Sequence, residues 1–160
     1  WVSSPQRRMR AVEALAKAGI PVGVMVAPVI PGLNDEDIAD VLAAAKDAGA
    51  GHAGYVLLRL PGSVKAVFEE RVREAFPLRA DKILSRLRET RGGELYDPRF
   101  GKRQTGEGPY AEIIAGVFEA AAKKHGLWDR RAHDGSHVEG STFQRPEKAS
   151  AQRPQLDLFG

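Results

Sequence analysis

Hydrophobic positions in the first part of the chain alternate between helical spacing and short continuous runs. Apolar side chains recur at helical spacing in residues 4–18, and Gly19 stands where such a helix would end. Residues 20–27 are almost entirely apolar, a second helical pattern follows over residues 38–45, and residues 53–58 form another apolar run. Continuous apolar runs are typical of parallel strands that are covered on both faces. The order helix, strand, helix, strand therefore predicts an α/β fold built on a parallel sheet or barrel.

The rest of the chain lacks this alternation and shows helical patterns around a long polar stretch. Apolar spacing predicts helices around residues 64–72 and 83–87, and residues 91–108 form a glycine-rich, charged loop. Structureless loops of this length inside a domain are usually functional or disordered. A last helix is expected to begin at Pro109, with an apolar stripe formed by Tyr110, Ile113, Ile114, Val117, Phe118 and Ala121. From about residue 127 the chain turns polar, and we expect it to be disordered.

The composition limits what the chain can do by itself. It contains no cysteine, which excludes disulfides, thiolate zinc sites, a cysteine nucleophile and a cysteine-held cluster within these 160 residues. No window approaches the roughly 18 consecutive apolar residues of a membrane span, so we expect no membrane insertion. The absence of cysteine fits a reducing compartment, and we expect a cytoplasmic location. The chain opens on Trp1 and a polar stretch, and we expect it to be a fragment or a processed product.

The turn at residues 28–36 follows the first apolar run and is the most informative stretch for chemistry. Parallel α/β folds bind their ligands at the carboxyl ends of the strands. Gly32 would let a ligand approach the backbone, and Ile30 would present an apolar face to a flat ring. Asn34 is placed to cap the second helix, as Ser4 is placed to cap the first. The alternative is a rigid connector, because proline, glycine and asparagine favour turns in any protein.

Residues 19–35 (GIPVGVMVAPVIPGLND) resemble the fifth strand and following loop of radical S-adenosylmethionine (SAM) enzymes, most closely a bacterial branch similar to spore photoproduct lyase. The family pattern G-x-I-x-G-x-x-E falls here on Pro28, Ile30, Gly32 and Asp35. Pro28 replaces the first glycine and Asp35 replaces the glutamate, so the backbone at residue 28 departs from the pattern. The resemblance implies that the isoleucine contacts the adenine ring of SAM.

Two further stretches extend the resemblance to about residues 4–126. Residues 53–62 (AGYVLLRLPG) resemble the sixth strand, whose end borders SAM, and residues 88–101 (RETRGGELYDPRFG) resemble the C-terminal extension of the same branch. The SAM-contacting residues that the resemblance implies are Ile30, Gly32, Asn34, Asp35, Leu58 and Arg59. In the family, a C-x-x-x-C-x-x-C loop after the first strand holds a 4Fe–4S cluster. That loop and the first four strands are missing from this sequence.

The fold that these observations predict is the C-terminal part of a (β/α)6 barrel of the TIM type, followed by helices. We expect residues 1–62 to form the partial barrel, residues 63–126 a helical extension and residues 127–160 a disordered tail. In an intact radical SAM enzyme the cluster cleaves SAM reductively, and the resulting 5′-deoxyadenosyl radical abstracts hydrogen from a substrate. The resemblance implies that this chain supplies part of the SAM pocket and of the substrate surface, with the missing N-terminal half as its partner. No residue is assigned as a catalytic group or as a metal ligand, and the chain alone is expected to be inactive.

Positive charge is concentrated between residues 71 and 103, which contain ten Lys or Arg and five Asp or Glu. Arginines on the expected helices and in the loop after them could bind the phosphates of a nucleic acid, while Tyr96 and Phe100 could stack on its bases. A nucleic-acid substrate would also suit the likeness to spore photoproduct lyase. The alternatives are a solvated helix face, which is the usual meaning of a charge run, and a buried structural role for Tyr96.

The end of the chain carries a motif of a different class. The sequence QLDLF resembles the peptide that binds the bacterial DNA sliding clamp, and its contact residues would be Gln155, Leu156, Leu158 and Phe159. Two leucines and a phenylalanine on a flexible tail suit docking in an apolar groove. The alternative function is therefore a non-catalytic, DNA-associated interaction module that is recruited to the clamp. His133 and His137 have the i, i+4 spacing of metal ligands, but a solvated tail is the better interpretation because no third ligand accompanies them.

Overall fold

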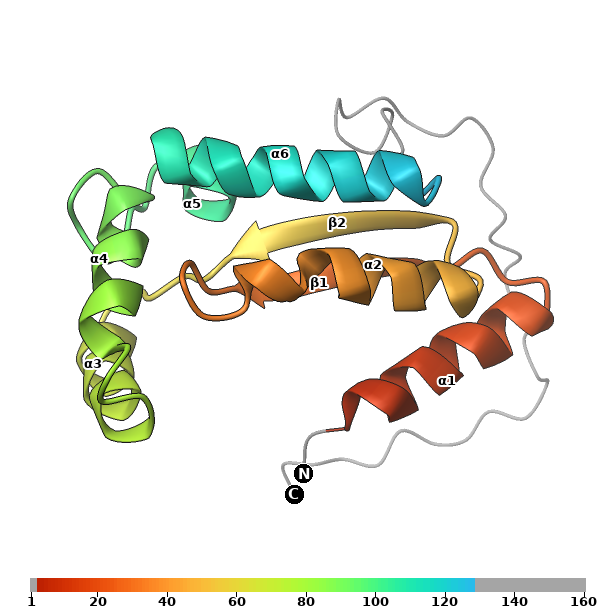
Figure 1. The fold of residues 1–160 in the computed structure, drawn as a ribbon, viewed down its shortest axis with the longest axis horizontal. Helices are drawn as coiled ribbons and strands as arrows, with labels where there is room; N and C mark the ends of the chain where they lie inside the picture. The colour runs from red at the N-terminus through yellow and green to blue at the C-terminus, as the bar shows by residue number, and fades with distance from the viewer. Residues whose placement is uncertain (1–2, 129–160) are drawn as a thin grey trace, which may run out of the picture. The chain divides into compact units, whose positions relative to one another are not determined.

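A computed structural model describes residues 3–128 of the chain. Its elements follow in the order α1 (Pro5–Lys17), β1 (Gly23–Val29), the 3-10 helix η1 (Asp35–Asp37), α2 (Ile38–Asp47), β2 (His52–Leu57), α3 (Val64–Ala75), α4 (Ala80–Glu89), α5 (Lys102–Thr105) and α6 (Pro109–Lys124). Figure 1 shows these elements along the chain. The fold is mixed α/β with a small parallel sheet, which confirms the predicted class at this level.

The first helix begins and ends where the sequence predicts. The Ser4 side chain accepts a hydrogen bond from the backbone N–H of Arg7 at 3.3 Å. Pro5 opens the helix at a position where no backbone donor is needed. Gly19 has φ +73°, in the left-handed region that glycine adopts without strain, and this conformation ends the helix. Met9 and Val12 are the partly buried side chains by which α1 contacts the core.

The two strands form a parallel sheet in which Val26 of β1 pairs with Tyr55 of β2. The register shifts between Val26 and Val29, next to the cis peptide bond that precedes Pro28. Beyond this irregularity the Leu58 N–H donates to the Val29 carbonyl at 2.8 Å, so the strands stay joined up to their ends. Because the strands run in the same direction, both carboxyl ends lie at one edge of the sheet (Figure 1).

Helices α2 and α6 cover one face of this sheet and pack against each other (Figure 1). The largest side chains of the shared core are fully buried and comprise Ile38, Leu42, Leu57, Ile114 and Phe118. Helix α2 precedes residue 62 and helix α6 follows it. The expected segments 1–62 and 63–126 therefore contribute to one hydrophobic core.

The buried stripe of α6 differs from the predicted one. Ile114 is buried as expected, but Ile113 and Val117 remain 58% and 44% exposed. The positions that replace them in the core are Ala111 and Ala122. A helix that is apolar on most of its surface does not reveal from its sequence which face will be buried.

The other face of the sheet is open in the described part of the chain, whereas the sequence predicts strands covered on both faces. Met25 is 63% exposed on this face and lies beside Gly54, where an added Cβ would stand 3.3 Å from its sulfur. His52 lies beside Gly23 on the neighbouring pair of positions. The apolar run of β1 thus includes side chains that no element within residues 3–128 covers.

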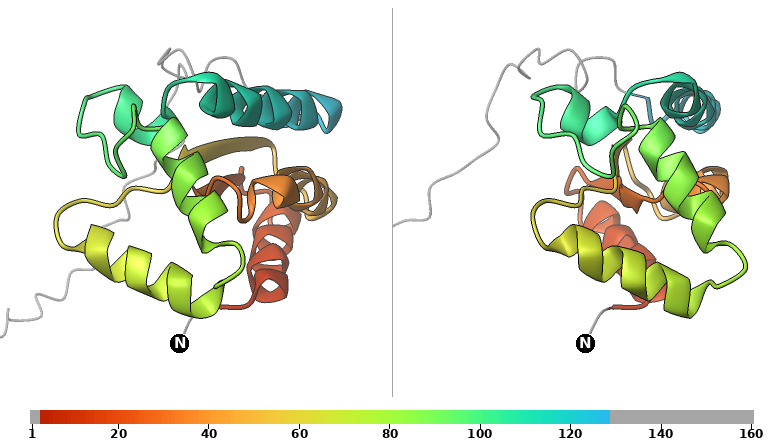
Figure 2. Two further views of the ribbon diagram at one scale, coloured as in Figure 1. Left: turned by 60° about the vertical axis from the view of Figure 1, so that its left-hand side comes forward. Right: turned by 90° about the vertical axis from the view of Figure 1, so that its left-hand side faces the viewer.

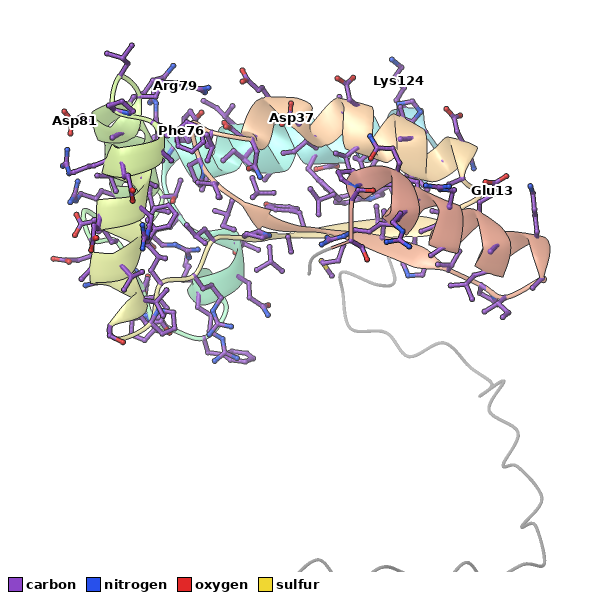
Figure 3. All side chains as sticks on the ribbon, turned by 90° about the horizontal axis from the view of Figure 1, so that it is seen from below. Glu13, Asp37, Phe76, Arg79, Asp81 and Lys124 are labelled. Atoms are coloured by element: carbon purple, nitrogen blue, oxygen red, sulfur yellow. The ribbon has the colours of Figure 1, made fainter. Side chains whose placement is uncertain are left out.

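Helices α3 and α4 lie beyond the carboxyl ends of the strands, as Figure 2 shows from two further directions. Leu60 and Leu95 pack with Leu84 and Leu87 of α4, and this cluster joins the end of β2 to the helical extension. In Figure 3 the labelled residues Phe76, Arg79 and Asp81 mark the turn between α3 and α4 and the start of α4. The labelled residues Glu13 and Lys124 mark the opposite end of the fold.

Two parts of the chain contain more structure than the sequence predicts. The polar stretch 91–108 includes the short helix α5. Leu127 is fully buried, and its carbonyl accepts a hydrogen bond from the Ala53 N–H at 3.0 Å, so the expected tail begins inside the fold. The QLDLF motif and the pair His133 and His137 lie outside the described residues. Within residues 3–128, no helix has both the length and the apolar composition that a membrane crossing requires.

Candidate functional site

The loop between β1 and α2 folds back on itself at the carboxyl edge of the sheet. Asn34 Oδ1 accepts a hydrogen bond from the Ile30 N–H at 2.7 Å, and Asn34 Nδ2 donates to the Pro28 carbonyl at 3.2 Å. Asp35 Oδ1 accepts from the Gly32 N–H at 2.8 Å. These two side chains bind backbone groups that have left the strand ladder, and they hold the loop in one conformation.

Asn34 does not cap α2, so the predicted helix cap is wrong. Its carboxamide makes no capping bond and points back to the preceding loop. The chain instead passes through one turn of 3-10 helix, Asp35–Asp37, before α2 begins. An asparagine ahead of a helix can bond forward to the helix amides or backward to its own loop, and the backbone path decides between the two.

Gly32 is buried with φ +78°, but the group that approaches it closely belongs to the protein. A Cβ added to Gly32 would lie 3.3 Å from Arg86 Cγ and 3.6 Å from Ile83 Cα, both in α4. The Gly32 carbonyl also accepts a hydrogen bond from Arg79 Nη2 at 3.0 Å. Helix α4 therefore occupies the side of the glycine where the sequence suggests a ligand.

Ile30 and Leu58 are half-buried neighbours at the ends of the two strands. Ile30 directly follows Val29, whose carbonyl accepts the hydrogen bond from the Leu58 N–H. Ile30 packs on the cluster formed by Val72, Ala80 and Ile83, and Leu58 packs on the neighbouring leucine cluster of α4. Each residue is only partly buried, so each leaves some surface exposed at the edge of the sheet.

A buried arginine joins the end of β2 to the loop that follows α4. Arg91 is 2% exposed, and it donates from Nη2 to the Leu58 carbonyl at 2.8 Å and from Nη1 to the Lys102 carbonyl at 2.9 Å. Its Nε is buried without a hydrogen-bond partner. Burial lowers the pKa of Arg91, the carboxylate of Asp97 opposes this effect, and the nearby positive charge of Arg59 adds to it. Arg59 itself is exposed at the same edge.

A second polar group, which the sequence analysis missed, lies on the other side of the loop. The Tyr110 hydroxyl donates to Asp35 Oδ2 at 2.5 Å, and the Arg86 guanidinium stands 4.5 Å from the centre of the Tyr110 ring. Burial and then the bond to Asp35 raise the pKa of Tyr110 to about 12. A cavity of about 260 Å³ opens beside this group, and its lining includes Gly32, Arg79, Lys82, Ile113 and Val117. The helical spacing of Tyr110 indicated only a core position.

The six residues that the resemblance implies for SAM binding thus divide into two groups. Ile30, Leu58 and Arg59 leave side-chain surface free at the edge of the sheet. The polar groups of Gly32, Asn34 and Asp35 are engaged in hydrogen bonds within the loop or to neighbouring helices. The second group therefore shapes the loop, and the first group is partly or fully exposed at the ends of the two strands.

Most basic residues between 71 and 103 have acidic partners, which weakens the expectation that the helix arginines follow phosphates. The ion pairs join Arg71 to Glu74, Arg73 to Asp81, Arg79 to Glu36, Arg86 to Glu89, Arg88 to Glu69, and both Arg99 and Lys102 to Glu107. Exposed pairs of this kind add little stability, but each reduces the net positive charge of the surface. Tyr96 is half-buried against the leucine cluster of α4, which agrees with a structural role rather than with base stacking.

No group of three or more metal-ligating side chains occurs within residues 3–128. Comparison of the chain with protein families, with curated proteins and with solved structures found no match. The resemblance to radical SAM enzymes is therefore a resemblance of sequence stretches alone.

Proposed function

We propose that this chain is the C-terminal part of a radical SAM enzyme, in which it supplies one wall of the SAM pocket and part of the substrate surface. The observation that carries the proposal is the placement of Ile30, Leu58 and Arg59 at the carboxyl edge of two parallel strands. Active sites of parallel barrels lie at this edge. The order of the stretches 19–35, 53–62 and 88–101 agrees with the family.

The chemistry of the three residues at the strand ends supports contact with SAM. The adenine ring is flat and apolar on both faces, and the side chains of Ile30 and Leu58 offer it an aliphatic surface. SAM also carries a carboxylate, for which the exposed guanidinium of Arg59 is a suitable partner. The hydrogen bonds of Asn34 and Asp35 keep the loop in place and so act as positioning contacts.

The open face of the sheet supports a partial barrel. Met25 is exposed in the middle of β1, and the outer edges of both strands have no partner strand within residues 3–128. Open strand edges beside exposed apolar side chains favour association with further strands. The N-terminal half of a barrel would supply strands that pair with these edges. We propose that half as the partner of this side of the sheet.

A 4Fe–4S cluster does not fit the residues of this chain. The chain has no cysteine, and its described residues contain no group of metal-ligating side chains. Cluster ligands would have to come from the N-terminal half. The share of this chain is to bind and orient SAM and the substrate, and we expect it to be inactive alone.

Calorimetric titration of the chain with SAM tests the proposal. We expect weak binding, because this chain supplies one wall of the pocket. Ile30→Asp places a charge against the adenine face and should abolish the binding heat. Ile20→Asp is the matched control, since Ile20 is an exposed isoleucine between α1 and β1, at the opposite end of the strand.

Retention of SAM binding by Ile30→Asp would contradict the proposal, as would equal losses in the two variants. Absence of any SAM binding by the wild-type chain would remove its proposed role in the pocket. Circular dichroism of both variants separates a lost contact from a lost fold.

A further inference from the structure

The free positive charges near the end of β2 differ from those that the sequence suggests. On α3 and α4 the arginines have acidic partners, but Arg59 and Arg103 form no ion pair with any residue between 3 and 128. Both are fixed to the same place through Arg91, whose guanidinium bonds the carbonyls of Leu58 and Lys102. These carbonyls belong to the residues directly before Arg59 and Arg103. One buried side chain therefore brings the backbones of two unpaired arginines together.

An exposed aromatic ring accompanies these charges. Phe100 is 90% exposed, and the Arg103 guanidinium lies 5.2 Å from the centre of its ring. This distance is within the range of a cation–π contact, so the arginine and the ring form one unit. The next aromatic residue in the loop, Tyr96, is packed against leucines and is not part of this surface.

The loop that carries the ring is braced at its base. Arg99 donates from Nε to both carboxylate oxygens of Asp97 at 3.0 Å and from Nη2 to Glu107 at 2.5 Å. The bonds to Asp97 hold the pKa of that carboxyl at about 2, so the pair stays ionised at neutral pH. A braced loop presents Phe100 and Arg103 with a small loss of conformational entropy on binding.

We propose that Phe100, Arg103 and Arg59 form a binding surface for single-stranded nucleic acid. A phenyl ring in water offers a stacking partner to an unpaired base, and the Arg103 guanidinium beside it offers a partner to an adjoining phosphate. Arg59, whose backbone is joined to the same place through Arg91, offers a second charge for the strand. Bases in a duplex are stacked on each other and cannot reach a ring on a short loop. An acidic protein surface would form ion pairs with the two arginines but would leave the Phe100 ring without a stacking partner. As a substrate site this surface rests on the proposed function, whereas its binding of nucleic acid needs neither SAM nor a cluster.

Fluorescence anisotropy with a labelled oligothymidine of about 20 nucleotides tests the surface, since this length exceeds the typical site size of about 4–16 nucleotides. Phe100→Ala should weaken binding about fivefold to about 150-fold, the range for loss of one stacked base. Arg59→Gln and Arg103→Gln should each weaken binding and reduce the slope of log affinity against log salt by about 0.7. The matched controls are Arg71→Gln and Arg73→Gln, which remove the same charge from ion-paired positions on α3.

The control variants are expected to bind as the wild type does, and a duplex of the same length is expected to bind more weakly than the single strand. Equal losses in the controls and in the loop variants would overturn the proposal, because they would indicate diffuse attraction. Unchanged affinity of Phe100→Ala, full competition by polyglutamate, or no binding of the oligonucleotide would overturn it as well. Because this assay contains no SAM, its failure leaves the SAM titration unaffected, and failure of that titration leaves this assay unaffected.

Discussion

Replacement of Gly32 by alanine tests the placement of helix α4 against the loop between β1 and α2. At φ +78° an alanine has left-handed strain of about 1–2 kcal/mol. The lower entropy of the unfolded alanine chain offsets about 0.4–1 kcal/mol of this. The new Cβ would also stand 3.3 Å from Arg86 Cγ, which is a tight contact, whereas Ile83 Cα at 3.6 Å is at an ordinary van der Waals distance. Because the Arg86 side chain is flexible, this overpacking costs about 1 kcal/mol, at the low end of the usual range. We therefore expect Gly32→Ala to lower the free energy of unfolding by about 1–3 kcal/mol.

Gly19→Ala is the matched control for the strain of an alanine in the left-handed conformation. Gly19 has a similar φ of +73°, but no other group lies within 4 Å of its added Cβ. The free energy of unfolding of Gly19→Ala should fall by about 1 kcal/mol, which is the backbone strain less the entropy offset. Urea denaturation followed by far-ultraviolet circular dichroism gives both free energies. Equal destabilisation in the two variants would refute the close approach of α4 to Gly32.

Three further predictions concern ionisation and cluster assembly. The pKa of Tyr110 is raised to about 12, so its stabilising effect is present below the ordinary pKa of about 10 and is lost as pH rises towards 12. Tyr110→Phe should remove the last-ionising component of the phenolate absorbance titration, whereas loss of a component near pH 10 with the last one retained would contradict the raised pKa of Tyr110. The pKa of Asp97 is lowered to about 2, first by its hydrogen bond from Arg99, so its contribution to stability is present above about pH 4 and is lost as pH falls towards 2. The difference in urea midpoint between wild type and Asp97→Asn should therefore shrink over this interval, and a constant difference would count against the pair. Reconstitution of the chain with iron and sulfide should give no brown cluster absorbance, and a stable cluster on this cysteine-free chain would contradict our assignment of its ligands to the N-terminal half.

Local signals predicted the elements that depend on nearby residues. Ser4 and Gly19 bound α1 because a cap and a left-handed glycine act within one turn of the helix. The apolar runs gave both strands and their parallel arrangement. These features follow from residues a few positions apart, which a sequence displays directly.

Other features depend on contacts between distant segments and could not be predicted. Nothing in the sequence distinguishes Arg91, which is buried, from Arg88, which pairs with Glu69 at the surface. The bond between Tyr110 and Asp35 joins residues 75 positions apart. Similarly, the sequence predicted that Asn34 caps the second helix, but the path of the loop directs its amide backward to residues 28 and 30.

The candidate site shows the same division. The predicted loop at residues 28–36 is correct for residues 30–34, which a strand and a helix flank, whereas Pro28 and Val29 belong to β1 and Asp35 and Glu36 to η1. The sequence could not show that α4 fills the space beside Gly32, since that contact depends on how the helical extension returns to the sheet.

The most direct test of the proposed SAM contact is a nuclear magnetic resonance titration of the chain with isoleucine methyl groups labelled with carbon-13. On addition of SAM, the methyl signal of Ile30 should shift, because the ring current of adenine acts on a group in contact with its face. The signal of Ile113, which lies beside the cavity next to α6, should stay in place. A shift of Ile113 with an unchanged Ile30, or no shift of any isoleucine signal, would contradict the account.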